Sequence, residues 1–215
     1  MMKAYVIRIK GHQLSEQASV RCIKSAARNG LEVKPWDAVT PKDKPLQKLM
    51  DMGIDPTPFD EIYSRTLNCA SAFLSHYSLW EESYKTNEKI VIFEHDAVVY
   101  SKVPTDVEFE YVMTFSQPSY GEYKNPLTLG VNPLTQKHYF GGAHGYIVKP
   151  KGAKYLIDQA QNEVRPADVY LNLHYFPFLQ EHYPWSCTAM DNFTTIQTQE
   201  GCHAKHRFGE TYEIV

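Results

Sequence analysis

The amino-acid sequence predicts an α/β fold, a single domain over residues 1–215 in which helices flank one sheet. Segments rich in β-branched and apolar residues alternate with helical segments in the order β, α, β, α, β. One helical segment repeats apolar residues at spacings of three and four, which is typical of one buried face. The strand after it is a continuous apolar run, as in strands buried on both faces. This order favours a parallel sheet whose ligand lies beyond the carboxyl ends of the strands.

The first half of the predicted sheet comes from residues 4–39. Residues 4–9 (AYVIRI) form the expected opening strand, and Ser15 is the expected N-cap of a helix over residues 16–28. Asn29 and Gly30 are typical of a helix end. A second strand is expected over residues 31–39.

The later elements follow a proline-rich connector over residues 41–59, which holds a short amphipathic helix near residues 46–52. A longer helix is expected from about Thr66, and its apolar face carries Cys69, Ala72, Phe73, His76 and Trp80. The buried strand covers residues 89–94. Further strands are expected at residues 109–115 and 144–148, with helices at residues 152–161 and from about Asp168.

Composition excludes several classes of protein. No apolar stretch approaches the roughly 20 residues of a membrane-spanning helix, and residues 1–12 lack the pattern of a signal peptide, so a cytoplasmic location is expected. The net charge of -3 is not gathered into a basic block that would bind nucleic acid tightly. The four cysteines form no C-x-x-C pair and are interpreted as reduced thiols. Phosphate-loop, G-x-G-x-x-G and G-x-S-x-G motifs are absent.

Two carboxylates stand where the buried strand ends. Because side chains alternate along a strand, Glu94 and Asp96 are expected on one side and His95 on the other. Neighbouring carboxylates repel each other unless a cation, a donor or a proton lies between them, and a hard divalent ion is the natural partner. The alternative interpretation is a pair of solvated residues at a strand end.

The sequence around this pair resembles a known family. The segment NCASAFLSHYSLWEESYKTNEKIVIFEHDAVV is similar to the central signature of glycosyltransferase family 25, in which a helix precedes an apolar strand that ends in an acidic triplet. AYVIRI, GLEVKPWDAVTP and GGAHGYIVKPKGAKYLI resemble three other family segments. The resemblance covers roughly residues 3–175 and fades from about residue 176. In this chain His95 replaces the middle carboxylate of the triplet.

The resemblance implies a GT-A fold, a Rossmann-like nucleotide-binding sheet, and transfer of a sugar from a nucleotide diphosphate donor, with a UDP-sugar the expected donor. It implies a metal ion, Mn²⁺ or Mg²⁺, that stabilises the leaving diphosphate. The implied metal ligands are Asp96, Glu94 and a histidine near the C-terminus, His203. The residues implied on the donor side are Arg8, Asp37, Ser75, His76 and Glu94. Without the family, His76 is interpreted as a core histidine.

An attack from the face opposite the leaving group inverts the anomeric carbon and requires a general base. Asp168 fits a P-x-D context of the family, and Asp191 is the reserve candidate. A helix N-terminus beside Asp168 would favour its ionised form, and the alternative role is a plain helix cap. Tyr120 and Tyr123, in a loop rich in glycine and proline, and His144, beside Gly145, are the expected acceptor contacts.

The acceptor itself stays open among a glycan, a protein side chain and a modified DNA base. Two other functions also stay open. One is a nucleotide-sugar-binding protein without turnover, and the other is a metal-dependent nucleotide hydrolase or nucleotidyltransferase. The oligomeric state cannot be read from the sequence.

Overall fold

The computed structural model describes residues 2–60, 64–190, 193–196 and 213–214. The helices of these residues are α1 (Gln13–Arg28), α2 (Pro45–Asp51), α3 (Thr66–Thr86), α4 (Pro150–Ala160) and α5 (Ala167–Tyr170), with short 3-10 turns η1 (Pro41–Asp43) and η2 (Thr57–Phe59). The strands are β1 (Lys3–Arg8), β2 (Lys34–Asp37), β3 (Ile90–Glu94), β4 (Ala97–Val99), β5 (Val112–Thr114), β6 (Gly130–Pro133), β7 (Gly145–Val148), β8 (Gln180–Tyr183), β9 (Cys187–Ala189), β10 (Phe193–Thr194) and β11 (Glu213–Ile214).

One central sheet holds seven of these strands in the order β2-β1-β3-β7-β5-β8-β6. β1 pairs in parallel with β2 and β3, as predicted, and β5 pairs in parallel with β8. β7 runs antiparallel to β3 and β5, and β6 runs antiparallel to β8, so the expectation of a parallel sheet is wrong for this half. Parallel neighbours require a long crossover, usually a helix, and residues 115–144, which join β5 to its neighbour β7, contain no helix.

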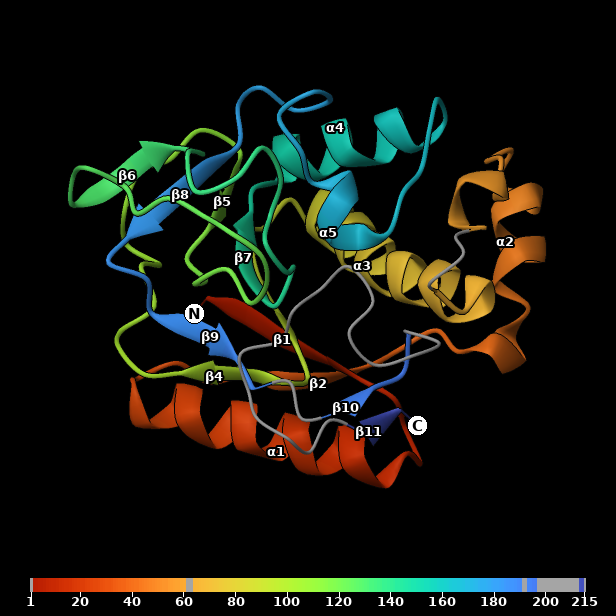
Figure 1. Cartoon of the computed structure of the whole chain (residues 1–215), viewed down its shortest axis with the longest axis horizontal. Coiled ribbons are helices and arrows are strands. Elements are labelled where there is room, and N and C mark those ends of the chain that lie inside the picture. Colours follow the sequence, from red (N-terminus) through yellow and green to blue (C-terminus); the bar gives the residue numbers. More distant parts are fainter. Residues whose placement is uncertain (1, 61–63, 191–192, 197–212, 215) are drawn as a thin grey trace.

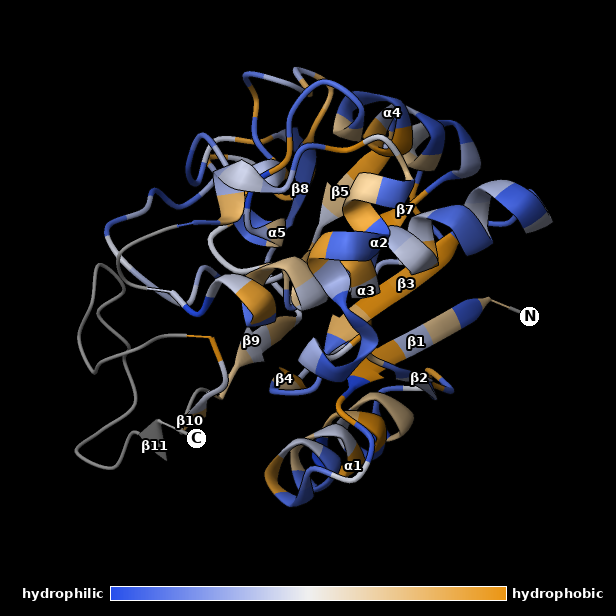
Figure 2. Cartoon of the chain, turned by 90° about the vertical axis from the view of Figure 1, so that its right-hand side faces the viewer, coloured by the Kyte–Doolittle hydropathy of each residue, from blue (hydrophilic) through white to orange (hydrophobic). Residues whose placement is uncertain are grey.

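Helices cover both faces of the sheet, which confirms the predicted α/β layering. In Figure 1, α1 lies on one side of the β1–β2 edge, whereas α3, α4 and α5 lie on the other. The turned view in Figure 2 shows β3 and β7 as apolar strands enclosed between these layers. This arrangement of sheet and helices places the candidate functional site at one end of the sheet.

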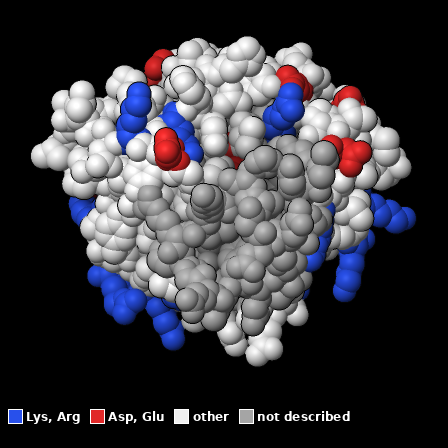
Figure 3. Space-filling view, viewed as in Figure 1, with Lys and Arg blue, Asp and Glu red and all other residues white. Residues whose placement is uncertain are grey.

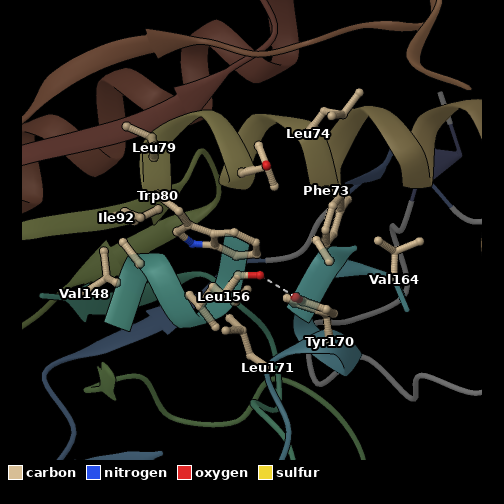
Figure 4. Packing of buried hydrophobic residues seen from close by; sticks show 14 of the residues in the cluster. Phe73, Leu74, Leu79, Trp80, Ile92, Val148, Leu156, Val164, Tyr170 and Leu171 are labelled. Carbon is tan, nitrogen blue, oxygen red and sulfur yellow. Dashed lines mark hydrogen bonds between the residues drawn. The ribbon is translucent and has the colours of Figure 1, made fainter. Parts of the chain in front are cut away.

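The two layers bury alternate residues of the same strands. Val91 and Phe93 of β3 belong to the core on the α1 side, whereas Ile90 and Ile92 belong to the core on the α3 side. Neighbouring strands follow the same period of two, with Tyr146 of β7 on the α3 side. Trp80 projects from α3 into this core toward α4 and α5 (Figure 4).

Several element boundaries differ from those predicted. α1 begins at Gln13 because His12, not Ser15, is its N-cap; the Ser15 hydroxyl instead accepts a hydrogen bond from the Ile9 amide at 2.8 Å. The strand expected over residues 31–39 shortens to β2, since pairing with β1 covers only residues 34–37. The strand expected over residues 109–115 likewise shortens to β5. The predicted helix near residues 46–52 is α2, and the one over residues 152–161 is α4.

The surface carries no concentrated charge on the face shown in Figure 3, where the described basic and acidic groups are scattered and both signs are present. Among the residues with assigned positions, no helix is both long enough and apolar enough to cross a membrane.

Candidate functional site

A pocket of about 870 Å³ opens at the carboxyl ends of β1, β2 and β3. Its walls come from segments far apart in the sequence: the loops after β1 and β2, the first turns of α3, the end of β3, and the start of α5. The charged residues in its lining are Lys10, Lys42, Glu94, Asp96, Lys137 and Asp168. The edge of the sheet predicted to face a ligand therefore does carry a pocket.

Glu94 is the last residue of β3 and faces the α3 side. It continues the parity of Ile90 and Ile92, and its Oε1 lies 3.1 Å from Nε2 of His76 on α3. About a third of the Glu94 side chain is exposed (33%). Desolvation, followed by the negative charges of Asp96 and Asp168, raises the pKa of Glu94 well above its usual range. The carboxylates are thus close enough to affect one another.

His95 points the other way, as the alternation predicted. Its Nδ1 lies 3.0 Å from the Ser15 hydroxyl on α1, and its ring stacks on Phe193 at 5.2 Å between centroids. Burial lowers the pKa of His95. His95 therefore packs against α1 rather than standing between Glu94 and Asp96.

Asp96 follows β3 in a turn and also lines the pocket. Burial raises the pKa of the Cys22 thiol and lowers the pKa of His144, and the negative charge of Asp96 is a second influence on both groups that acts to raise their pKa values. Within the described ranges, no three groups drawn from His, Cys, Asp and Glu are placed to hold a metal ion together. His203, the predicted third ligand, lies outside the described residues.

His76 is a buried imidazole with partners on both ring nitrogens. Nε2 faces Glu94, and Nδ1 lies 2.9 Å from the Tyr146 hydroxyl, which also accepts a hydrogen bond from the Trp80 indole at 2.8 Å. Burial lowers the pKa of His76 to about 4, so the ring is neutral at neutral pH. Its contact with Glu94 is therefore a hydrogen bond of a neutral ring and not an ion pair. His76 is both a core histidine and part of the pocket lining.

Asp168 lies in α5 and enters the same pocket from the second half of the chain. Its Oδ2 accepts a short hydrogen bond from the Tyr120 hydroxyl, and its Oδ1 accepts one from the Val169 amide at 2.9 Å. Burial raises the pKa of Asp168, and the Tyr120 hydrogen bond opposes that rise. The backbone amide of Val169 at the start of α5 acts in the predicted direction, since its hydrogen bond favours the ionised carboxylate, but burial is the larger effect and the pKa of Asp168 is raised.

Tyr120 belongs to a small cluster of aromatic rings and a cation. Its ring stacks on Tyr139 at 6.4 Å, and the Lys137 ammonium lies 5.2 Å from the Tyr120 centroid and 5.4 Å from that of Tyr139. All three side chains line the pocket. Tyr120 was predicted as an acceptor contact, and in this structure its hydroxyl is engaged by Asp168.

Ser75 and His144 also lie in the pocket wall. The Ser75 hydroxyl donates to the Ser71 carbonyl at 2.7 Å and accepts from the Val39 amide at 2.9 Å, so it joins α3 to the loop after β2. His144 is buried, and its Nε2 has no hydrogen-bond partner among the positioned residues. Desolvation lowers the pKa of His144.

Three predicted residues with described positions, Arg8, Asp37 and Tyr123, lie outside the lining. Arg8 pairs with Asp37 at 3.1 Å and with Glu16 at 3.4 Å, which ties together the ends of β1, β2 and α1. Tyr123 packs edge-on against Trp185 and accepts a hydrogen bond from Gln117. Asp191, the reserve base, falls outside the described residues.

The residues of the pocket wall that the sequence analysis missed include His12, Lys137, Tyr139 and Phe193. His12 caps α1 and stacks on Phe193. A histidine is not a preferred N-cap, and the other three lie in segments without periodicity, so no sequence signal marked them.

Comparisons with known proteins agree with the resemblance in the sequence. The profile of glycosyltransferase family 25 (LPS biosynthesis protein) matches residues 1–111. A Haemophilus influenzae protein named as a glycosyltransferase is 29% identical over 150 residues, covering 62% of this chain and 49% of that protein. An Anopheles gambiae glycosyltransferase 25 family member is 26% identical over 185 residues, covering 72% of this chain and 28% of that protein.

The chain therefore spans about half the length of the first relative and about a quarter of the second. Mouse xyloside xylosyltransferase 1 is a solved structure with a TM-score of 0.48 and 11% identity, covering 84% of both chains. Because the family profile extends over more than half of the sequence, including β3, Glu94 and Asp96, the chain belongs to glycosyltransferase family 25.

Proposed function

We propose that this chain transfers a sugar from a nucleoside diphosphate donor to an acceptor hydroxyl. The observation that carries the proposal is the meeting of Glu94, Asp96 and Asp168 in one pocket at the carboxyl ends of β1, β2 and β3. Such an edge of an α/β sheet is where nucleotides bind. Membership of glycosyltransferase family 25 supports the reaction class.

The donor side of the proposed site is built from Glu94 and Asp96. Carboxylate oxygens are the ligands that Mg²⁺ and Mn²⁺ prefer, and such ions commonly bind one or two carboxylates together with substrate phosphates and water. Burial, and after it the negative charge of Asp96, raises the pKa of Glu94, and a bound cation would stabilise the ionised form that both effects disfavour. A bound divalent ion would stabilise the negative charge of the departing diphosphate.

The acceptor side is built around Asp168. As general base, Asp168 takes the proton of the acceptor hydroxyl while the hydroxyl oxygen bonds to the anomeric carbon and the bond to the diphosphate oxygen breaks. A single displacement of this kind inverts the anomeric carbon. Both Asp168 oxygens have a partner, from Tyr120 and from Val169, so the carboxylate is held in a fixed orientation.

The remaining lining residues support roles in binding. Ser75 and His76 line the same pocket as Glu94 and Asp96 and are the proposed donor contacts, whereas His144, also in the lining, is a proposed acceptor contact. Tyr120 and Tyr139 present aromatic faces of the kind that stack on sugars, and Lys137 adds a positive charge beside them. A UDP-sugar is the proposed donor, and a glycan, a protein side chain or a modified DNA base is the proposed acceptor class.

A nucleotide-sugar screen tests the proposal. Thermal unfolding of the full chain is measured with each nucleotide sugar, with and without Mn²⁺, and the best donor is then incubated with glycan, peptide and DNA acceptors. The proposal predicts nucleoside diphosphate release that depends on an acceptor. Release of nucleoside monophosphate would instead indicate a hydrolase, and donor binding without release would indicate a binding protein.

A further inference from the structure

A chain of hydrogen bonds runs from the core of the protein to Glu94. The Trp80 indole nitrogen lies 2.8 Å from the Tyr146 hydroxyl, which lies 2.9 Å from His76 Nδ1, and His76 Nε2 lies 3.1 Å from Glu94 Oε1. Trp80, His76 and Tyr146 are almost completely buried. The arrangement therefore connects the pocket to Tyr146 and Trp80, which lie outside its lining.

The fold brings these four side chains together from three elements. His76 and Trp80 are four residues apart on α3, so they lie on the same face of the helix. Tyr146 of β7 pairs with Ile92 of β3, two residues before Glu94, and both belong to the α3 side of the sheet. Register and helical spacing thus fix the chain of contacts.

The donors and acceptors in this chain admit one consistent direction. An indole nitrogen only donates, so the Tyr146 oxygen is the acceptor from Trp80. The Tyr146 hydroxyl proton then needs an acceptor, and the one that contacts it among the described residues is His76 Nδ1. An imidazole that accepts at Nδ1 carries its proton on Nε2, and Nε2 faces the Glu94 carboxylate.

The reverse direction leaves a buried group unsatisfied. If His76 Nδ1 donated to Tyr146, the hydroxyl proton of Tyr146 would find no acceptor among the described residues. A buried donor without a partner loses the full energy of its hydrogen bonds to water. His76 Nε2 would then carry no proton, and its contact with Glu94 would require a protonated Glu94.

We propose that Tyr146 and Trp80 are positioning residues, which hold His76 with its proton on Nε2 so that it donates to Glu94 and fixes that carboxylate in the pocket. This hydrogen bond uses Oε1 of Glu94 and leaves Oε2 available to the nucleotide-sugar donor. The consequence for binding rests on the proposed function, whereas the position of the proton does not. Outer groups that orient a ligand-binding side chain commonly contribute to affinity in this way.

Nitrogen NMR of the full chain labelled with ¹⁵N-histidine tests the proton position directly. His76→Gln assigns the His76 signals by their loss. The wild type is expected to show a protonated Nε2 and an unprotonated, hydrogen-bonded Nδ1. This measurement needs no variant of Tyr146, so it decides the direction even if such a variant fails to fold. A proton on Nδ1 in the wild type would overturn the proposal.

Two tyrosine variants then separate positioning from packing. Tyr146→Phe removes the hydroxyl that bonds Nδ1. Tyr170→Phe is the matched control, because Tyr170 is also buried, stacks on Trp80 at 5.6 Å, and donates its hydroxyl proton to the Leu156 carbonyl (Figure 4). Tyr146→Phe is expected to shift the His76 Nδ1 signal, and Tyr170→Phe is expected to leave it in place.

The same pair of variants measures the consequence for the donor. Using the nucleotide sugar that gives the largest thermal shift, Tyr146→Phe is expected to weaken binding about fivefold, the effect of one typical hydrogen bond, while Tyr170→Phe changes it less than about twofold. An equal loss in both variants, or an unchanged His76 spectrum in Tyr146→Phe, would overturn the positioning role. If the proton lies on Nε2 but no nucleotide sugar binds the wild type, the proposed function fails and the hydrogen-bond direction stands.

Discussion

Glu94 and Asp168 share one pocket, but the structure supports them in different ways. Glu94 ends a central strand, and its partner His76 is held by Tyr146 and Trp80 in the core between the sheet and α3. Asp168 lies in a one-turn helix, and its partner Tyr120 comes from a segment between β5 and β6. Regular structure supports the first carboxylate, and loops support the second.

This difference coincides with the extent of the family profile. Glu94 and Asp96 lie within residues 1–111, whereas Asp168, Tyr120 and Lys137 lie beyond them. Loops tolerate changes in sequence and conformation better than the elements they join. We infer that the part of the pocket proposed for the sugar donor tolerates fewer changes in sequence and conformation than the part proposed for the acceptor.

The largest expected effect comes from Asp168. Asp168→Asn keeps the shape of the side chain but removes the proposed base, so transfer should fall by about 10² to 10⁴ fold. Donor binding should stay within about twofold, because the proposed donor contacts lie at Glu94 and Asp96. Initial rates and donor titrations check both outcomes.

A carboxylate of α4 provides the control for that variant. Asp158 is exposed and pairs with Lys154 outside the pocket, so Asp158→Asn should leave transfer unchanged. Turnover like that of the wild type in Asp168→Asn would remove Asp168 from the role of base.

Substitution of Asp96 should weaken binding of the nucleotide-sugar donor and the metal and should leave the fold largely unchanged. Asp96→Ala removes a proposed metal ligand, so the part of the donor's thermal shift that depends on Mn²⁺ should disappear. At a donor concentration of 100 times its dissociation constant, the total stabilisation of the wild type by the donor amounts to about 2.7 kcal/mol. Chelation of the metal should have the same effect on the wild type. An unchanged response to Mn²⁺ in Asp96→Ala would place the metal elsewhere.

The sequence predicts the Glu94 side of this comparison better than the Asp168 side. The apolar run of β3, the spacing of His76 and Trp80 on α3, and the opposite orientations of Glu94 and His95 all follow from periodicity. These features repeat over short distances along the chain. A pattern of this kind can be read without knowing the tertiary structure.

The Asp168 side depends on contacts that have no period. Tyr120 meets Asp168 across 48 residues, and Lys137 reaches Tyr120 from a loop. The antiparallel course of β7 and the N-cap at His12 likewise depend on how the chain returns to the sheet. Propensity alone could not identify them, because tertiary contacts decide these positions.

A smaller effect is expected from the hydrogen bond between Tyr120 and Asp168. This bond stabilises the ionised carboxylate and so lowers the pKa of Asp168 against the effect of burial. In Tyr120→Phe that pKa should rise, and the acid limb of the pH profile of kcat/KM should move to higher pH. Transfer at a pH just above the wild-type limb should therefore fall, and it should recover at higher pH. Tyr123→Phe is the matched control, because Tyr123 lies in the same loop but contacts Gln117 and Trp185. An equal shift in both variants would contradict the assignment.

The smallest expected effect concerns stability, and it tests whether His144 is buried in its neutral form. His144 belongs to the second half of the chain, yet burial lowers its pKa. Below the ordinary histidine pKa of about 6.5, the unfolded chain binds a proton there that the folded chain does not, so the free energy of unfolding falls as the pH drops. Glu94 and Asp168, whose pKa values are raised, change stability in the opposite direction over their own range, because the folded state then binds protons more readily.

Urea unfolding of the wild type and of His144→Gln is measured at several pH values. Both proteins contain Glu94 and Asp168, so the difference between their free energies of unfolding cancels the contribution of these two carboxylates. The variant should lose less stability than the wild type between about pH 6.5 and pH 5. Parallel curves would mean that His144 binds a proton in the folded state as readily as in the unfolded chain.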